Sequence, residues 1–287
     1  QAEKRFLDAF DLREDLTRQV RSALEANRSL LGIYVAFEPN ALDGKDELFA
    51  DQENLGSNSN GRFSIYWSQG NNGELSSEAM TEEDLSNTTP GISGAPYNAW
   101  YSCPLQQKKV CLLDPYIDEA DGVKTLMTSI AFPLIKDDKV IGVLGVDISL
   151  ASLQELSSAA HQDLFDGAGH VSIISPAGSL AGHSRDSSLL GGKLEKAFTD
   201  QHREILNLVA SNRPETLRHE GALQVLQPLL PIPEAKPWGV LMEVPEQVLL
   251  ARATQLEAKM DEMGTRNTAM SLGLGLAAGV VGILLIW

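Results

Sequence analysis

The sequence predicts an α+β chain: a long N-terminal helix, two related antiparallel-sheet modules, then a helix leading into a transmembrane segment. Three patterns support this: helical periodicity at both ends, a strand-and-turn pattern that occurs twice between them, and an uncharged run at the C-terminal end. The expected segments are a long helix at 1–27, a first module at 28–158, a second module at 159–245, a helix at 246–267 and a transmembrane helix at 268–287.

The first helix is predicted from apolar residues that recur between charged ones. Phe6, Phe10, Leu16, Val20 and Leu24 follow one another at steps of four or six residues, as expected for one face of an amphipathic helix. A long helix that packs one side against a module is therefore expected here.

The two modules are predicted from a loose internal repeat. In each copy a strand and turn are followed later by a pair of strands: 61–67, 125–135 and 140–149 in the first copy, and 169–174, 222–230 and 238–244 in the second. Each closing pair reads Pro-Leu, a polar turn and Gly-Val-Leu, and the Gly-Val-Leu motif begins at Gly142 in the first copy and at Gly239 in the second. The alternative is a chance similarity between β-hairpins, because short strand patterns are degenerate.

The C-terminal run at 268–287 carries no charge and ends at Trp287. About 20 apolar residues are enough to cross a bilayer, and Trp suits its interface. Gly273, Gly275, Gly279 and Gly282 would weaken a soluble helix but suit packed membrane helices, so a buried core helix is the weaker alternative.

The chain is acidic, with a formal charge of −16 and a pI near 4.7. This disfavours nucleic acid and anionic lipid as partners and mildly favours cationic ones. Solubility alone would also explain the acidity, so the argument for a ligand must come from particular positions.

The only cysteines are Cys103 and Cys111. Outside the cytoplasm they would close a small disulfide loop, and otherwise they would be two reduced thiols. No metal site is expected, because the five histidines show no zinc-ligand spacing: His161, His170, His183, His202 and His219.

One run of motifs has a family resemblance. It reads Trp100-Tyr101, then Asp114-Pro-Tyr116-Ile-Asp118, then Gly145-Val-Asp147-Ile-Ser149. Together with the order of helices and modules, this resembles the double Cache (dCACHE) sensor domains of bacterial chemoreceptors and sensor kinases. The resemblance covers residues 1 to about 267 and implies PAS-like modules, one membrane-distal with the ligand pocket and one membrane-proximal.

Three residues of the central motif alternate. Asp114, Tyr116 and Asp118 would share one face of an extended segment, where two carboxylates beside an aromatic ring suit an ammonium group. An exposed polar turn is the alternative, favoured for Asp114, whereas the resemblance favours a ligand role for Tyr116 and Asp118.

Asp147 ends an apolar strand. Ser149 can cap the helix expected at 150–158, which leaves Asp147 free to turn inward beside Gly145, whose missing side chain would make room for a ligand. A buried carboxylate needs a cation, and a bound amine would supply one.

Aromatic residues gather in two short stretches, at Tyr66 and Trp67 and at Tyr97, Trp100 and Tyr101. Aromatic rings around carboxylates bind amines, although these rings could equally form the core of the module.

Asn98 is a departure from the dCACHE pattern. In the members that bind α-amino acids, an Arg at this place holds the ligand carboxylate, and a neutral amide cannot replace its charge. The resemblance therefore points to the amine-sensing subgroup, whose ligands include putrescine, other polyamines and histamine.

The prediction is a non-enzymatic sensor domain of a methyl-accepting chemotaxis receptor, dimeric through its long helices, in a bacterial inner membrane with residues 1–267 in the periplasm. No cofactor, metal or nucleic acid is expected. An amino-acid sensor that uses Arg62 or Lys124 as a clamp is one alternative, and the sensor part of a histidine kinase or diguanylate cyclase is another. An enzyme is disfavoured because no catalytic motif stands out, although two carboxylates among rings can resemble a glycosidase pair.

Overall fold

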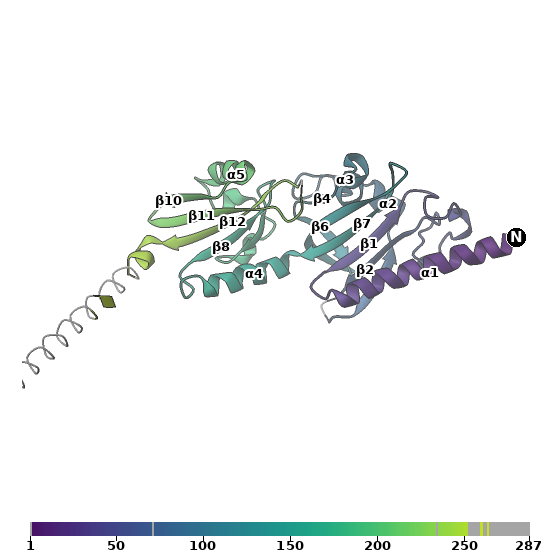
Figure 1. Cartoon of the computed structure of the whole chain (residues 1–287), viewed down its shortest axis with the longest axis horizontal. Coiled ribbons are helices and arrows are strands. Elements are labelled where there is room, and N and C mark those ends of the chain that lie inside the picture. Colours follow the sequence, from purple (N-terminus) through teal and green to yellow (C-terminus); the bar gives the residue numbers. More distant parts are fainter. Residues whose placement is uncertain (1, 71, 234, 252–258, 261–262, 264–287) are drawn as a thin grey trace, which may run out of the picture.

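The computed structural model describes residues 2–70, 72–233, 235–251, 259–260 and 263. Figure 1 shows two sheet-containing modules side by side along the long axis, with the N-terminal helix against one of them. Both sheets are antiparallel, as the sequence predicts.

The elements follow one another in the order of the predicted repeat. The helices are α1 (Ala2–Ala26), α2 (Glu82–Ser86), α3 (Ala99–Gln107), α4 (Leu150–Asp163) and α5 (His202–Ser211). The strands of the first sheet are β1 (Gly32–Phe37), β2 (Ser64–Gln69), β3 (Leu75–Ala79), β4 (Cys111–Leu112), β5 (Tyr116–Ala120), β6 (Val123–Lys136) and β7 (Lys139–Ser149). Those of the second are β8 (His170–Ile174), β9 (Leu180–His183), β10 (Glu215–His219), β11 (Ala222–Leu229) and β12 (Trp238–Pro245). Short 3-10 turns lie at Asp46–Leu48, Glu53–Leu55, Ser187–Leu189 and Leu194–Lys196.

The first sheet has the strand order β3-β2-β1-β7-β6-β4, and β5 also pairs with β6. This sheet and the helices α1 to α3 together are called the first module. Alternation along β1 separates its two faces: Ile33 and Val35 pack with Val20 and Leu24 of α1, while Tyr34 belongs to a second core on the other face. The functional residues described below lie on this second face, away from α1.

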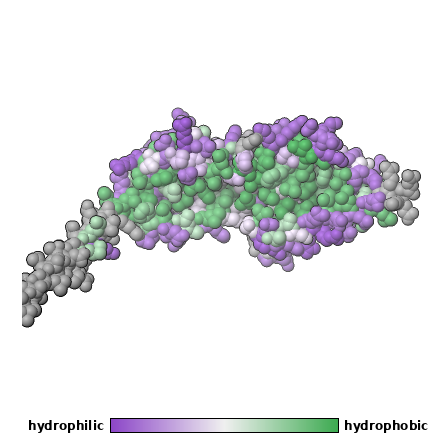
Figure 2. Space-filling model, viewed as in Figure 1, coloured by the Kyte–Doolittle hydropathy of each residue, from purple (hydrophilic) through white to green (hydrophobic). Residues whose placement is uncertain are grey.

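The second sheet has the strand order β10-β11-β12-β8-β9. This sheet and the helices α4 and α5 together are called the second module. Its α5 face holds an apolar core around Leu226 and Leu241, and α4 packs on β8 and β9. In each module a long hairpin pairs with the strand that follows the first helix, β1 or β8. Figure 2 shows hydrophobic residues gathered in a band along both modules, with hydrophilic residues around its edges.

The register of the repeat differs from the match of the two Gly-Val-Leu motifs. When these motifs are aligned, Asp147 of the first module corresponds to Val244 of the second. In the structure, however, Asp147 and Glu243 occupy equivalent positions: each lies three residues before a helix, on a strand that is paired on both sides. Asp147 and Glu243 are therefore the corresponding residues. The motif match is off by one residue, which in a strand reverses the face.

The predicted membrane helix at 268–287 lies outside the described residues, as does most of the helix expected at 246–267. Residues 246–251 are helical. None of the described helices is both long enough and apolar enough to span a membrane.

Candidate ligand-binding site

A cavity of about 250 Å³ opens on the face of the first sheet that is turned away from α1. It is called the first-module cavity below. Its lining residues are Tyr34, Tyr66, Glu78, Ala79, Met80, Thr81, Asp84, Tyr97, Trp100, Tyr116, Asp118, Glu119 and Asp147. Six of the ten predicted site residues line it: Tyr66, Tyr97, Trp100, Tyr116, Asp118 and Asp147.

Asp147 lies at the inner end of this cavity and is 3% exposed. The Ser129 hydroxyl donates a hydrogen bond of 2.5 Å to its carboxylate. Because a serine has only one hydroxyl hydrogen, Ser129 must accept from Tyr116 Oη, which is 2.6 Å away. Burial raises the pKa of Asp147 to about 7, against the lowering effect of the Ser129 bond and with a further rise from Asp118.

Tyr34 was not predicted as a site residue, and it fills the space beside Gly145. The two residues are cross-strand neighbours, and a Cβ on Gly145 would stand 2.0 Å from Cζ of Tyr34. The Tyr34 hydroxyl donates to the Trp100 carbonyl at 3.0 Å. The expectation that Gly145 makes room for a ligand is therefore wrong: its missing side chain admits a tyrosine ring that forms the cavity wall.

Asp118 faces the cavity from β5. It accepts hydrogen bonds from the Tyr97 hydroxyl and from the backbone amide of Glu119. Burial raises the pKa of Asp118 despite these bonds, and nearby carboxylates add to the rise. Tyr97 therefore holds an anion in place without neutralising it.

Two further polar atoms of the lining are buried without a hydrogen-bond partner within the described chain: Tyr66 Oη and Trp100 Nε1. The Tyr66 hydroxyl lies near Asp147, where it favours the charged carboxylate. Buried polar groups are nearly always paired, so Trp100 Nε1 indicates that a ligand or water completes the site, whereas the Tyr66 hydroxyl has the Asp147 carboxylate beside it.

The charge of the lining is one-sided. It contains five carboxylates, Glu78, Asp84, Asp118, Glu119 and Asp147, while none of its described residues is a Lys, Arg or His. Buried carboxylates without a cation are costly, which is why burial raises the pKa of Asp147. A positively charged ligand would remove this cost.

Two predicted aromatic residues lie elsewhere. Trp67 points to the α1 face, where the Arg21 guanidinium lies 5.5 Å from its ring centroid. Tyr101 is buried behind Trp100, and its hydroxyl bonds Glu38 and Arg62. Side chains of neighbouring residues on a strand point to opposite faces, so Tyr66 and Trp67 could not both reach the cavity.

Arg62, the candidate clamp for a carboxylate, is fully engaged by the protein. Its guanidinium bonds the Phe37 carbonyl at 2.5 Å and forms ion pairs with Glu38 at 3.0 Å and Glu82 at 3.1 Å. Lys124 lies on the exposed start of β6 and is not part of the lining. Neither residue is placed to bind a ligand carboxylate in this cavity.

Asn98 is buried and has a structural task. Its side-chain amide donates to the Leu85 carbonyl at 2.9 Å, which links the start of α3 to α2. It does not line the cavity. Asn98 is neutral, so it supplies no positive charge at the position where the amino-acid-binding dCACHE pattern has an arginine.

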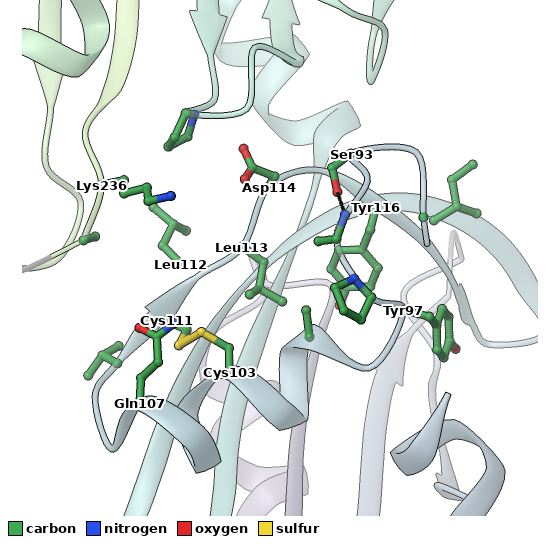
Figure 3. A pocket seen from close by; sticks show the side chains of 18 residues that line it. Ser93, Tyr97, Cys103, Gln107, Cys111, Leu112, Leu113, Asp114, Tyr116 and Lys236 are labelled. Atoms are coloured by element: carbon green, nitrogen blue, oxygen red, sulfur yellow. Dashed lines mark hydrogen bonds between the residues drawn. A yellow bond between two sulfur atoms is a disulfide. The ribbon is translucent and has the colours of Figure 1, made fainter. Parts of the chain in front are cut away.

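Asp114 faces a different, larger cavity of about 370 Å³ between the two modules (Figure 3). Asp114 accepts a hydrogen bond of 2.9 Å from the Ala177 backbone amide of the second module. The expected common face of Asp114, Tyr116 and Asp118 is thus not formed, because Asp114 precedes β5 and its carboxylate is turned toward the second module.

This inter-module cavity also contains the disulfide that joins Cys103 of α3 to Cys111 of β4 (Figure 3). Of the two alternatives for these cysteines, the paired form is the one observed. Tyr97 and Tyr116 line both cavities, so their rings separate the two. The larger cavity lacks the one-sided charge, since Lys236 accompanies Asp114 in its lining.

Comparison with known proteins places these features in context. Residues 16–155 match the family model described as methyl-accepting chemotaxis protein-like, first PDC sensor domain. Over all 287 residues the chain is 57% identical to the methyl-accepting chemotaxis protein TlpQ of Pseudomonas aeruginosa, of which it covers 40%. A second relative, PscA of Pseudomonas syringae, is 30% identical over 44% of the chain and 20% of its own length.

Two solved structures share the fold. The extracellular domain mmHK1S-Z3, from a protein named as a histidine kinase, matches 85% of this chain and 83% of its own with a TM-score of 0.70 and 25% identity. Methyl-accepting Chemotaxis protein X matches 81% of both chains with a TM-score of 0.60 and 29% identity. The chain spans less than half the length of the curated relatives that it matches.

Proposed function

Because residues 16–155 match the model of a methyl-accepting chemotaxis protein-like PDC sensor domain, we propose that this chain senses cationic amines through its first-module cavity. The chain is a ligand-binding, non-enzymatic sensor domain. The ligands proposed are putrescine, other polyamines and histamine.

One observation carries the proposal: five carboxylates line a small cavity whose described lining holds no protein cation. Asp147 would form a charge-assisted hydrogen bond with an ammonium group at the inner end, and Asp118 would approach it from β5. The rings of Tyr34, Tyr66 and Trp100 would add cation–π attraction of about 0.5 to 2 kcal/mol.

An amino acid fits this cavity less well. Its carboxylate would enter a lining that is already anionic, and the guanidinium of Arg62 is held by Glu38 and Glu82. Like charges in a region of low dielectric repel strongly. This favours ligands that carry positive groups alone.

The whole protein is proposed to be a chemoreceptor of the inner membrane, with the sensor domain on the periplasmic side. The identity to TlpQ over the full chain supports this, and the disulfide fits an oxidising compartment. Dimerisation through the long helices, and a membrane helix at 268–287 that transmits the signal, belong to the same proposal. The fold shared with mmHK1S-Z3 favours a sensor kinase as the second candidate output.

A thermal-shift screen tests the ligand class. At one hundred times the dissociation constant, a bound amine should stabilise the chain by about 2.7 kcal/mol and raise its melting temperature, whereas glycine and alanine should not. Asp147→Asn should remove the shift, and Glu243→Gln, a matched change in the second module, should keep it. A shift with amino acids and none with amines would contradict the proposal.

A further inference from the structure

Three of the five histidines of the chain lie close together in the second module, on three different elements. The rings of His161 on α4 and His170 on β8 are stacked, with their centroids 5.2 Å apart and their planes 6° from parallel. His183 on β9 is 3% exposed, and its Nδ1 lies 2.9 Å from the Ser172 hydroxyl. Together with the buried carboxylate of Glu243, these residues are called the histidine cluster below.

The charged groups nearest to the cluster come from the turn after β9. Arg185 Nη2 lies 3.9 Å from Glu243 Oε2, and the Arg185 side chain is 54% exposed. Asp186 follows it and lies on the surface. From β11 and from the residue before α5 come uncharged amides, since Gln224 donates to both Glu243 and Gln201. At neutral pH the buried carboxylate is therefore balanced by one half-exposed cation.

Two atoms of the cluster are buried without a hydrogen-bond partner within the described chain: His170 Nδ1 and Glu243 Oε2. Their residues are directly opposite each other on β8 and β12, where the Cβ atoms of such a pair are about 5 Å apart. A neutral imidazole donates from one nitrogen, whereas a protonated one donates from both. A proton taken up by His170 would therefore supply a donor beside an unused carboxylate oxygen.

The arrangement at neutral pH resists this proton. Burial lowers the pKa of His170 and of His183, and the Arg185 guanidinium lowers both further, while Glu243 opposes the change. Histidine in an unfolded chain titrates near 6.5, so below that pH the unfolded state binds more protons than this arrangement. The arrangement is thus fully stable above about pH 6.5 and loses stability as the pH falls through the lower pKa values of the folded chain.

A charged His170 and Arg185 compete for Glu243. Like charges at such short separations repel, and the stacked ring of His161 cannot become charged beside His170 without the same repulsion. Arg185 can leave at little cost, because its side chain is half-exposed and ion pairs of that kind contribute little. Acid therefore favours an arrangement in which His170 takes the place of Arg185.

The cluster lies at the C-terminal end of the second sheet. Glu243 is three residues before the helical residues 246–251, and β12 runs directly into them. At this junction Glu246 pairs with Arg218 of β10 at 3.4 Å, and the Arg218 side chain is exposed. An exchange of the cation at Glu243 therefore acts on the last strand before the C-terminal helix.

We propose that the histidine cluster makes the second module a sensor of mild acidity, in which a proton bound by His170 displaces Arg185 from Glu243 and loosens the end of β12. The ligand is the proton itself, taken from solvent, so the site needs no cavity. This function is separate from amine sensing and does not depend on what the first-module cavity binds.

Two measurements on the full chain between pH 8 and pH 5 test the proposal. Histidine ring NMR should show His170 and His183 gaining their protons below the ordinary range of histidine. Amide exchange of residues 240–251, corrected for its intrinsic pH dependence, should rise about fivefold or more from pH 7.5 to pH 5.5, and that of β1 and β7 should not.

Three variants separate proton sensing from a structural role. His170→Gln keeps an amide that can hydrogen-bond but does not titrate, so the rise in exchange should shrink to less than about twofold. Arg185→Gln removes the competing cation and should move the midpoint of the rise to higher pH. His202→Gln, at the start of α5 outside the cluster, is the matched control and should keep the full rise.

Titration of His170 and His183 at the ordinary value of histidine would refute the proposal, and so would a full acid response in His170→Gln. If His170→Gln does not fold, Arg185→Gln decides alone, because its side chain is half-exposed and its loss leaves the core intact. An unchanged midpoint in that variant would also refute the proposal, whereas a shift to higher pH supports it.

Discussion

The two modules place an acidic residue at the same point of the same central strand, yet the surroundings differ. Asp147 is followed after three residues by α4, and Glu243 is followed after three residues by the helical residues 246–251. Asp147 stands between Gly32 and Ser129, and Glu243 between His170 and Gln224.

Protein groups surround Glu243. Gln224 donates to it at 3.1 Å, Arg185 lies 3.9 Å from its other oxygen, and His170 is its cross-strand neighbour. Leu241, two residues earlier, lies in the apolar core of the second module. Asp147 has hydroxyl groups around it, a glycine two residues earlier, and an open cavity in front. Glu243 Oε2 also lacks a hydrogen bond within the described chain, but a protein cation lies near it, and the lining around Asp147 holds none.

The difference between Asp147 and Glu243 should be largest in their effect on the free energy of unfolding at pH 8. The pKa of Asp147 rises from 3.8 to about 7 on folding, so the folded chain binds this proton more tightly and loses stability as the pH rises through that window. Asp147→Asn should then raise the free energy of unfolding by up to about 4 kcal/mol at pH 8 and leave it unchanged below pH 4. Urea unfolding at the two pH values measures this.

Glu243→Gln is the matched change in that experiment. It should lower stability by about 1 kcal/mol or less at pH 8, because the Arg185 partner is half-exposed and the new amide can still accept from Gln224. If the two substitutions changed the free energy of unfolding equally, the proposed difference between the surroundings of Asp147 and Glu243 would be wrong.

Gly145→Ala should have the next largest effect. The new methyl group would overlap the buried Tyr34 ring, and displacing that ring would also break its bond to the Trp100 carbonyl. A loss of about 3 kcal/mol is expected, which thermal unfolding can measure. Adding Tyr34→Leu should recover part of the loss. A fully stable single variant would show that Gly145 does not serve to admit Tyr34.

The smallest effect concerns the pH dependence of amine binding. An ammonium ion binds the ionised form of Asp147, so a pKa of about 7 predicts an affinity about tenfold lower at pH 6 than at pH 8. Titration calorimetry with putrescine measures this, and Glu243→Gln should retain the same dependence. A flat profile would mean that Asp147 is already ionised in the free protein.

Local patterns were sufficient for the framework of the fold. The periodicity of α1, the long hairpins β6–β7 and β11–β12 and the start of α4 all follow from hydrophobic alternation and capping. Short strands such as β3 and β4 were missed, because a few residues carry too weak a pattern. The sequence alignment of the two repeats was wrong by one residue for another reason, since it paired Asp147 with Val244. A motif match does not contain the strand partners, and these decide to which face of the sheet a side chain points.

The candidate site divides along the same line. Sequence alone determined which residue types are present: acidic residues and rings close together, no arginine at Asn98, and an aspartate, Asp147, near the end of an apolar strand. Tertiary structure alone decided that Tyr34 fills the space of Gly145, that Trp67 turns away, that Asp114 bonds the second module and that Arg62 is used elsewhere. The physical reason is that the charge and size of a side chain are fixed by the residue itself. Whether that charge is neutralised depends on side chains from strands far apart in the sequence, and the register of strand pairing decides which of them come into contact.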